Sequence, residues 1–105
     1  LHAYVGADLA RRRWNIRDRA VLSAIRKHTL GAPSMSRLDV ILYVADAVSP
    51  DRRHPDAKRL RALAFQDLEA AFAGCLSAKL RHAIERGRWL HPLSVSLWNS
   101  RTERP

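Results

Sequence analysis

The sequence has almost no sulfur and no long apolar run, and each absence excludes a class of protein. Its 105 residues include one cysteine, Cys75, and one methionine, Met35. A single cysteine cannot form an internal disulfide, which excludes a disulfide-stapled scaffold and favours a reducing compartment, the cytoplasm. The longest apolar run, 40–48, is broken by Asp46 and is far shorter than the roughly 20 residues of a membrane-spanning helix.

Acidic residues are scarce relative to basic ones. Ten Asp and Glu stand against nineteen Lys and Arg, which gives a formal net charge of +9 and an isoelectric point near 11.2. A hydrophobic content of 47% predicts a folded chain rather than a disordered one. The charge makes polyanions candidate partners, including weak and non-specific ones, and we expect no membrane partner.

The apolar spacing predicts an all-α fold. Helices are expected over 1–13, 18–29, 36–48, 56–64 and 67–86, with a loop over 50–55. Asp18 is a candidate N-cap, and Ser36 with Asp39 forms a capping-box pattern. Gly87 stands where a helix-ending glycine belongs. The first helical pattern begins at Leu1 with no cap before it, so we expect upstream sequence and an apparently N-terminally truncated domain.

One segment of the sequence is compatible with either a strand or a helix. After Pro92, alternating apolar residues resemble a strand, but proline also suits the first position of a helix, and a lone strand would have no sheet to join. We therefore expect a helix there and a frayed tail over 101–105. In the helix over 36–48, we expect the core stripe to consist of Leu38, Ile41, Leu42, Ala45 and Val48.

Asp46 is the first candidate for chemistry, because it interrupts a segment suited to a core. A buried carboxylate costs several kcal/mol unless it is paired, hydrogen-bonded or bound to a metal. The alternative is that Asp46, together with Asp39 and Tyr43, marks the wetter edge of the helix. The sequence leaves both interpretations open.

Histidines and arginines supply the other candidates. His28 lies at the end of a predicted helix, where it suits a ligand facing an open site and equally a helix C-terminal histidine. No two histidines have the i, i+4 spacing of a helical metal pair. Most arginines are expected to be solvated surface charges. Arg52 is singled out because it lies six residues beyond Asp46 and its guanidinium suits phosphate oxygens.

Several sequence segments together resemble a known family. They are 24–31 (AIRKHTLG), Met35-Ser36, 41–46 (ILYVAD) and 49–52 (SPDR), preceded by 1–7 (LHAYVGA) and followed by 87–92 (GRWLHP). This series resembles the C-terminal part of the YqeK-type HD-domain proteins, which are symmetrical diadenosine tetraphosphate hydrolases of bacteria. The resemblance covers essentially the whole chain, with 1–100 as the C-terminal part of a single HD-type helical domain.

The resemblance implies an HD-superfamily helical bundle and a metal-dependent phosphohydrolase. Its metals would be divalent or trivalent ions, with iron the first candidate, held by His2, His28 and Asp46. Asp46 and His28 would be catalytic, and Arg52 would bind the substrate phosphates. A metal-activated water would split diadenosine tetraphosphate, the dinucleoside polyphosphate substrate, into two ADP.

One departure from the family pattern is large. The family's first metal-binding histidine and its His-Asp doublet lie upstream of the helix that opens this chain, and the sequence contains no His-Asp dipeptide. The expected ligand set is therefore incomplete, and the isolated chain is a candidate for an inactive one. The alternative function is a non-catalytic basic helical module that binds nucleotides or nucleic acid by charge. A homodimer is an open alternative to a monomer.

Overall fold

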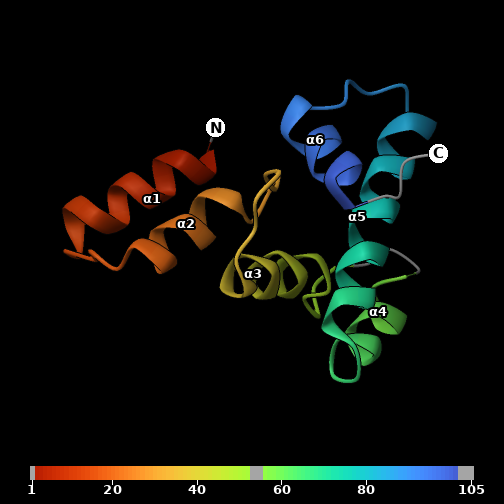
Figure 1. Ribbon diagram of the computed structural model, residues 1–105, viewed down its shortest axis with the longest axis horizontal. Coiled ribbons are helices and arrows are strands. Elements are labelled where there is room, and N and C mark those ends of the chain that lie inside the picture. Colours follow the sequence, from red (N-terminus) through yellow and green to blue (C-terminus); the bar gives the residue numbers. More distant parts are fainter. Residues whose placement is uncertain (1, 53–55, 102–105) are drawn as a thin grey trace.

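The structure describes residues 2–52 and 56–101, and within them every regular element is an α-helix. In this computed structural model (Figure 1) the helices are α1 (His2–Arg13), α2 (Arg19–Lys27), α3 (Arg37–Ala47), α4 (Ala57–Ala64), α5 (Leu68–Glu85) and α6 (Pro92–Arg101). The predicted all-α fold is confirmed, including the helix after Pro92. None of the described helices is long and apolar enough to cross a membrane.

The predicted caps explain where these helices begin. The Asp18 carboxylate accepts hydrogen bonds from the first backbone amides of α2 at 2.8 and 3.2 Å. At the start of α3, the Asp39 amide donates to the Ser36 hydroxyl at 3.1 Å and the Ser36 amide donates to the Asp39 carboxylate at 2.8 Å. This reciprocal pair is a capping box, and it satisfies two amides that the helix itself leaves without partners.

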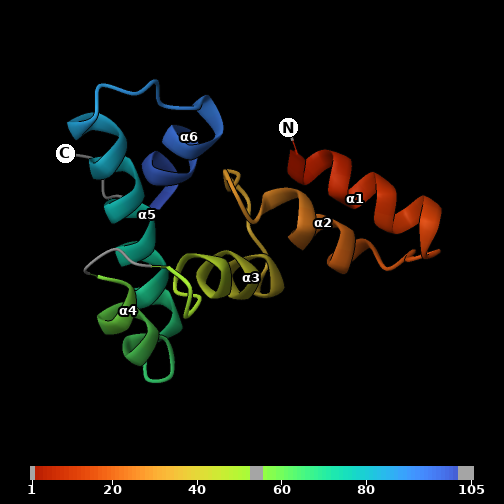
Figure 2. The ribbon, with the colours of Figure 1, turned by 180° about the vertical axis from the view of Figure 1, so that it is seen from behind.

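The helices form a hairpin and a body joined by α3. In the described chain α1 packs only against α2, and α2 then packs against α3. Figures 1 and 2 show this α1–α2 hairpin projecting to one side of α3, with α4, α5 and α6 on the other side. The long helix α5 contacts α3, α4 and α6, so it is the centre of the body.

The main core lies between α3, α4, α5 and α6. Its fully buried side chains include Val40, Tyr43, Leu60, Phe72, Leu76 and Leu97. The rings of Tyr43 and Phe72 meet edge to face, with centroids 5.1 Å apart. The core therefore fixes one face of α3 against α5, which is the geometry on which the site described below depends.

The predicted core stripe on α3 is largely wrong. Leu38 and Ile41 are 39% and 43% exposed, Ala45 is exposed, and only Val48 of the predicted set is buried. The buried residues are instead Asp39, Val40, Tyr43 and Val44. The reason is that α3 packs on two partners at once: Asp39 bonds to Ser23 and Lys27 of α2, while Tyr43 packs on Phe72 of α5, which leaves Leu38 and Ile41 on the outward side.

The ends of the described segments bear on two other predictions. Arg101, assigned to the tail by the sequence, is the last residue of α6. Its guanidinium lies 4.3 Å from the Phe72 ring centroid and 2.9 Å from the Glu69 carboxylate. The rest of the predicted tail, 102–105, lies outside the described residues.

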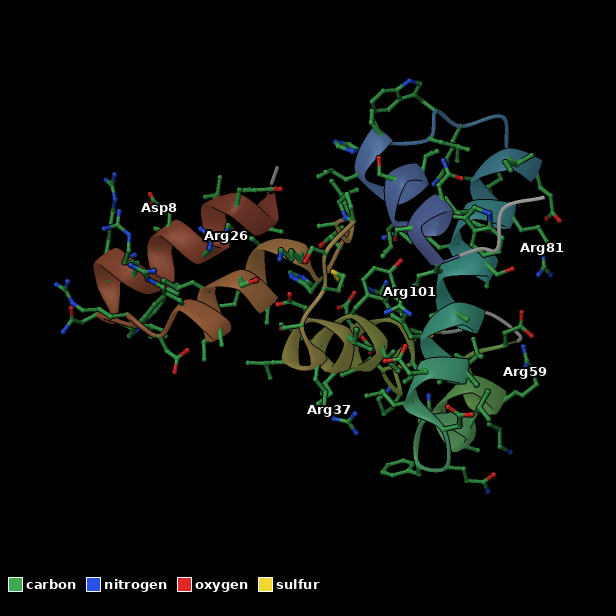
Figure 3. The ribbon with its side chains drawn as sticks, viewed as in Figure 1. Asp8, Arg26, Arg37, Arg59, Arg81 and Arg101 are labelled. Carbon is green, nitrogen blue, oxygen red and sulfur yellow. The ribbon has the colours of Figure 1, made fainter. Side chains whose placement is uncertain are left out.

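The arginines labelled in Figure 3 come from several different helices. Figure 3 shows Arg37 and Arg59 projecting from α3 and α4, while Asp8 lies far away on α1. The carboxylate of Asp8 pairs with Arg11 at 3.3 Å and Arg12 at 3.1 Å, and both ion pairs are open to solvent. The interpretation of most arginines as solvated charges fits this arrangement.

Two glycines in the left-handed region give a first testable prediction. Gly31 has φ +77° and its missing Cβ would collide with the Leu97 side chain, whereas Gly87 has φ +65° and open space around it. We expect Gly87→Ala to lose about 1 kcal/mol of unfolding free energy from backbone strain alone. Gly31→Ala should lose roughly 1 kcal/mol more because Leu97 must move. Urea unfolding followed by circular dichroism measures both, and equal losses would contradict the packing argument.

Candidate functional site

A cavity of about 420 Å³ opens where α2, α3 and α5 meet. Its walls come from the end of α2, the last turns of α3 with the loop that follows, and one face of α5. The lining residues are His28, Tyr43, Asp46, Ala47, Arg52, Asp56, Cys75, Ala78, Lys79, Arg81, His82 and Glu85. Residues far apart in the sequence are thus brought to one concave surface.

Three of the four residues singled out by the sequence line this cavity. His28 comes from the α2 end, Asp46 from the last turn of α3, and Arg52 from the loop after α3. The fourth, His2, is the first residue of α1, and its side chain lies outside the described part of the structure. The fold therefore brings together the three predicted residues whose side chains the structure describes.

His28 is held at the end of α2 by its own ring. Its Nδ1 lies 2.5 Å from the Ile25 carbonyl oxygen, which can only accept, so Nδ1 carries the proton. That bond satisfies a carbonyl at the helix end, as the C-terminal interpretation requires. It also makes Nε2 the acceptor nitrogen, the arrangement by which backbone carbonyls orient metal-binding histidines. This geometry agrees with the helix C-terminal interpretation, and the ligand role of His28 stays a prediction.

Asp46 is neither deeply buried nor fully solvated. Its side chain is 42% exposed, and its carboxylate pairs with the Arg52 guanidinium at 3.1 Å. The Arg52 Nε also donates to the Asp46 backbone carbonyl at 3.1 Å, which fixes the loop against the end of α3. Asp39, which one interpretation placed with Asp46 on the wetter edge, is fully buried instead. An ion pair this exposed adds little to the stability of the fold. Its main effect is to hold the Asp46 carboxylate and the Arg52 guanidinium together at the cavity.

The inner wall of the cavity is apolar enough to perturb two acidic groups. Burial, followed by the nearby Cys75 and Asp46, raises the pKa of Tyr43 well above its usual 10. Burial likewise raises the pKa of the Cys75 thiol to about 11, opposed by Arg59. Cys75 is thus a packed, protonated thiol, in line with its position on an apolar helical face.

Lys79 lies on the α5 side of the same cavity. Its ammonium group donates to the Thr29 carbonyl oxygen and lies 5.4 Å from the centroid of the Tyr43 ring. Partial burial of the ammonium group lowers the pKa of Lys79, although Asp46 acts in the opposite direction and much of the side chain stays exposed. Lys79 therefore supplies a positive charge to the cavity that Asp46 also lines.

The residues of the α5 wall were missed by the sequence analysis. Cys75, Ala78, Lys79 and His82 follow i, i+3, i+4, i+7 spacing, which puts them on one face of the helix. The helix over 67–86 was predicted from its apolar stripe alone, and no functional residue was assigned to it. A polar edge running along such a stripe was the signal that could have revealed a cavity wall.

Comparisons with known proteins match this arrangement over nearly the whole chain. A Clostridium acetobutylicum protein described as an HD superfamily hydrolase involved in NAD metabolism superposes with a TM-score of 0.89 at 35% identity, over 95% of this chain and 53% of that one. Proteins named symmetrical bis(5'-nucleosyl)-tetraphosphatase from Halalkalibacterium halodurans and Bacillus subtilis are each 34% identical, over 94% and 93% of the chain. The chain belongs to the YqeK-type HD-domain family. No protein-family model matches it.

The chain matches only part of the length of these YqeK-type proteins. The chain spans 53% of the length of both curated relatives. The structural similarity is high enough that the helices described here correspond to a continuous part of the HD fold. The remaining part of such a protein has no counterpart among the residues matched here.

HD superfamily hydrolases depend on divalent metal ions, so the donor set of this YqeK-type chain was tested for a metal. No group of three His, Cys, Asp or Glu side chains in residues 2–52 and 56–101, as far as these are described, could hold one. The cavity does offer two suitable donors, the Nε2 of His28 and the carboxylate of Asp46. An imidazole nitrogen and a carboxylate both suit a metal ion. Two donors are too few to hold one, so further ligands are required.

Proposed function

We propose that the chain forms part of a metal-dependent phosphohydrolase that splits diadenosine tetraphosphate symmetrically into two ADP. The observation that carries this proposal is the placement of His28, Asp46 and Arg52 in one cavity. Two relatives that are one-third identical bear the name of that activity. The reaction is assigned to the cytoplasm, where nucleotides are abundant and the lone thiol of Cys75 stays reduced.

Each of the three residues has a separate task in this proposal. His28 and Asp46, joined by His2, hold the metal, for which iron is the first candidate. A bound metal lowers the pKa of its water and offsets negative charge on phosphate oxygens. The Ile25 carbonyl fixes the His28 ring, and Arg52 fixes the Asp46 carboxylate, so that both donors are oriented before a metal arrives.

Arg52 has a second task, which is to bind substrate. Only part of its guanidinium is used by Asp46, and half of the side chain is exposed at the cavity. Guanidinium groups present several donors in one plane, which suits phosphoryl oxygens. The net charge of +9 also favours the approach of a highly negative dinucleotide. A cavity of 420 Å³ lies within the usual range of about 300–1,000 Å³ for small-molecule sites.

The test measures products from diadenosine tetraphosphate by ion-exchange chromatography. It uses the 105-residue chain and, in parallel, a fusion of this chain to the part of the Bacillus subtilis relative that it does not match. We expect two ADP per substrate from the fusion with added Fe²⁺ or Mn²⁺, and none after chelation with EDTA. Formation of AMP and ATP, or hydrolysis that ignores metal removal, would contradict the proposal. Salt-sensitive binding of nucleic acid without hydrolysis would favour the basic-module alternative instead.

A further inference from the structure

The hydroxyl group of Tyr43 is the starting point for a second assignment at this cavity. Tyr43 is 2% exposed, and its hydroxyl is the buried side-chain polar atom that has no hydrogen-bond partner in the described part of the chain. Buried hydroxyls are nearly always hydrogen-bonded, and leaving one without a partner costs roughly 1–3 kcal/mol. An orphaned hydroxyl on a cavity wall is therefore a group that a ligand atom would satisfy.

The orientation of Tyr43 is fixed by its neighbours. Its ring is packed edge to face on Phe72, and it lies in ordinary contact distance of the position where Gly31 lacks a Cβ. The groups that act on its hydroxyl electrostatically are Cys75 and Asp46, and both line the cavity. Tyr43 itself lines the same cavity, and its phenolic hydroxyl can donate a hydrogen bond there.

A positive charge lies over the ring that carries this donor. The Lys79 ammonium is 5.4 Å from the Tyr43 ring centroid and has three donor hydrogens, of which one is directed to Thr29. No carboxylate forms an ion pair with Lys79 within the described ranges. Asp46 at the cavity is already paired with Arg52, so its charge is offset.

The other charged groups that line the cavity do not cancel the positive charge of Lys79. Asp56 pairs with Arg59 at 3.4 Å. Glu85 lies on α5 with Arg81 one turn before it, and His82 lies between them in sequence. The site next to Tyr43 therefore offers an uncharged donor and a cationic donor, which is the chemistry that an oxygen anion requires.

We propose that Tyr43 and Lys79 form an anion subsite that binds a phosphoryl group of a nucleoside diphosphate, in the cavity that Asp46 and Arg52 also line. Tyr43 donates a hydrogen bond to one phosphoryl oxygen, and Lys79 supplies the opposing charge. The assignment rests on the proposed function for its ligand class, but it concerns binding and requires no bond cleavage. A cation is disfavoured at this place because both groups are donors.

The test measures binding of ADP and of inorganic tripolyphosphate to the 105-residue chain by isothermal titration calorimetry, in EDTA so that no metal contributes. We expect Tyr43→Phe and Lys79→Met each to weaken ADP binding about tenfold or more, the effect of one charge-assisted hydrogen bond. Lys79→Arg should restore much of the affinity. Tyr4→Phe and Lys58→Met, which make the same changes at exposed positions on α1 and α4, should leave it unchanged.

Thermal unfolding separates a ligand role from a purely structural one. Tyr43→Phe removes a hydroxyl that the folded chain leaves without a partner, so its melting temperature should stay the same or rise while ADP affinity falls. A raised melting temperature with unchanged ADP affinity would overturn the subsite, as would failure of the native chain to bind either probe.

The subsite and the proposed reaction fail in different ways. If both variants lose ADP affinity while the fusion forms no ADP from diadenosine tetraphosphate, the subsite stands and the proposed reaction is wrong. If the fusion forms ADP but the two variants bind ADP like the native chain, the reaction stands and the subsite is wrong.

Discussion

Replacing Asp46 with asparagine is expected to lower the rate of ADP formation by the fusion protein more than 100-fold. The amide keeps the shape of the side chain but loses the negative charge that a metal requires and that pairs with Arg52 at 3.1 Å. Loss of an outer-shell partner alone typically costs about 10–100-fold in metal affinity or activity, and loss of a ligand should exceed this. The steady-state rate and the metal content of the purified protein are the measurements.

The chain offers a matched control for this substitution. Asp8 is also a half-exposed carboxylate, 47% against 42% for Asp46, and it also pairs with arginine. Asp8→Asn should therefore change charge and stability by a similar small amount while leaving the rate intact. Equal rates in Asp46→Asn and Asp8→Asn would remove Asp46 from the catalytic assignment.

Replacing Asp39 with alanine is expected to cause the largest loss of stability, about 3 kcal/mol. Asp39 is fully buried and accepts hydrogen bonds from the Ser36 amide at 2.8 Å, the Ser23 hydroxyl at 3.0 Å and the Lys27 ammonium at 3.3 Å. Alanine would leave these donors without their acceptor and would remove the capping box of α3. Thermal unfolding followed by circular dichroism should show a melting temperature lower by 10 °C or more, on the scale of about 4–8 °C per kcal/mol.

Asp18→Ala is the control for the capping part of this effect. Asp18 caps α2 with two amide hydrogen bonds but is exposed and has no buried cation, so about 1 kcal/mol is expected. If Asp39→Ala cost no more than Asp18→Ala, the buried network would contribute nothing beyond a cap.

The acid dependence of stability provides a second measurement on Asp39. Burial by itself raises its pKa, but hydrogen bonds from Ser36, Ser23 and Lys27 outweigh this and hold the pKa below 3.8. Because the folded-state pKa is the lower one, the contribution is complete above the unfolded value and is lost as pH falls through the folded value. The native chain should therefore lose stability at acid pH more steeply than Asp39→Ala.

Local signals predicted the elements of this fold well. Asp18, Ser36 and Asp39 act through hydrogen bonds to residues two or three positions away, so the sequence contains all the information needed to place the helix starts. The burial of side chains depends on partners far away in sequence. The sequence could not decide whether Asp39 lies on a wetter edge, because Ser23 and Lys27, which make its burial possible, lie on another helix.

The candidate site shows the same division. His28 was singled out by its place at a helix end, Asp46 because it interrupts an apolar segment, and Arg52 because it follows Asp46 by six residues. A family resemblance supported all three, and they line one cavity. Lys79 and the Tyr43 hydroxyl acquire their meaning only from packing, because α5 must first lie against α3 before they meet. The local pattern offers only the polar edge of α5 as a signal for Lys79, and it does not show which element that edge faces.

The position of the α1–α2 hairpin has a consequence for how ligands act on the whole chain. Figure 1 shows the hairpin projecting to one side of α3. The cavity lining includes His28 at the end of the hairpin and Asp46 and Lys79 of α3 and α5, so the cavity spans the joint between hairpin and body. Side-chain bonds across that joint include those of Asp39, the bond from Lys79 to the Thr29 carbonyl and the bond from the Ser94 hydroxyl to the Leu30 carbonyl at 2.8 Å. A small molecule that contacts both sides would stabilise the hairpin against the body. Amide hydrogen exchange in α1 and α2 would then slow, although the molecule touches neither helix along most of its length.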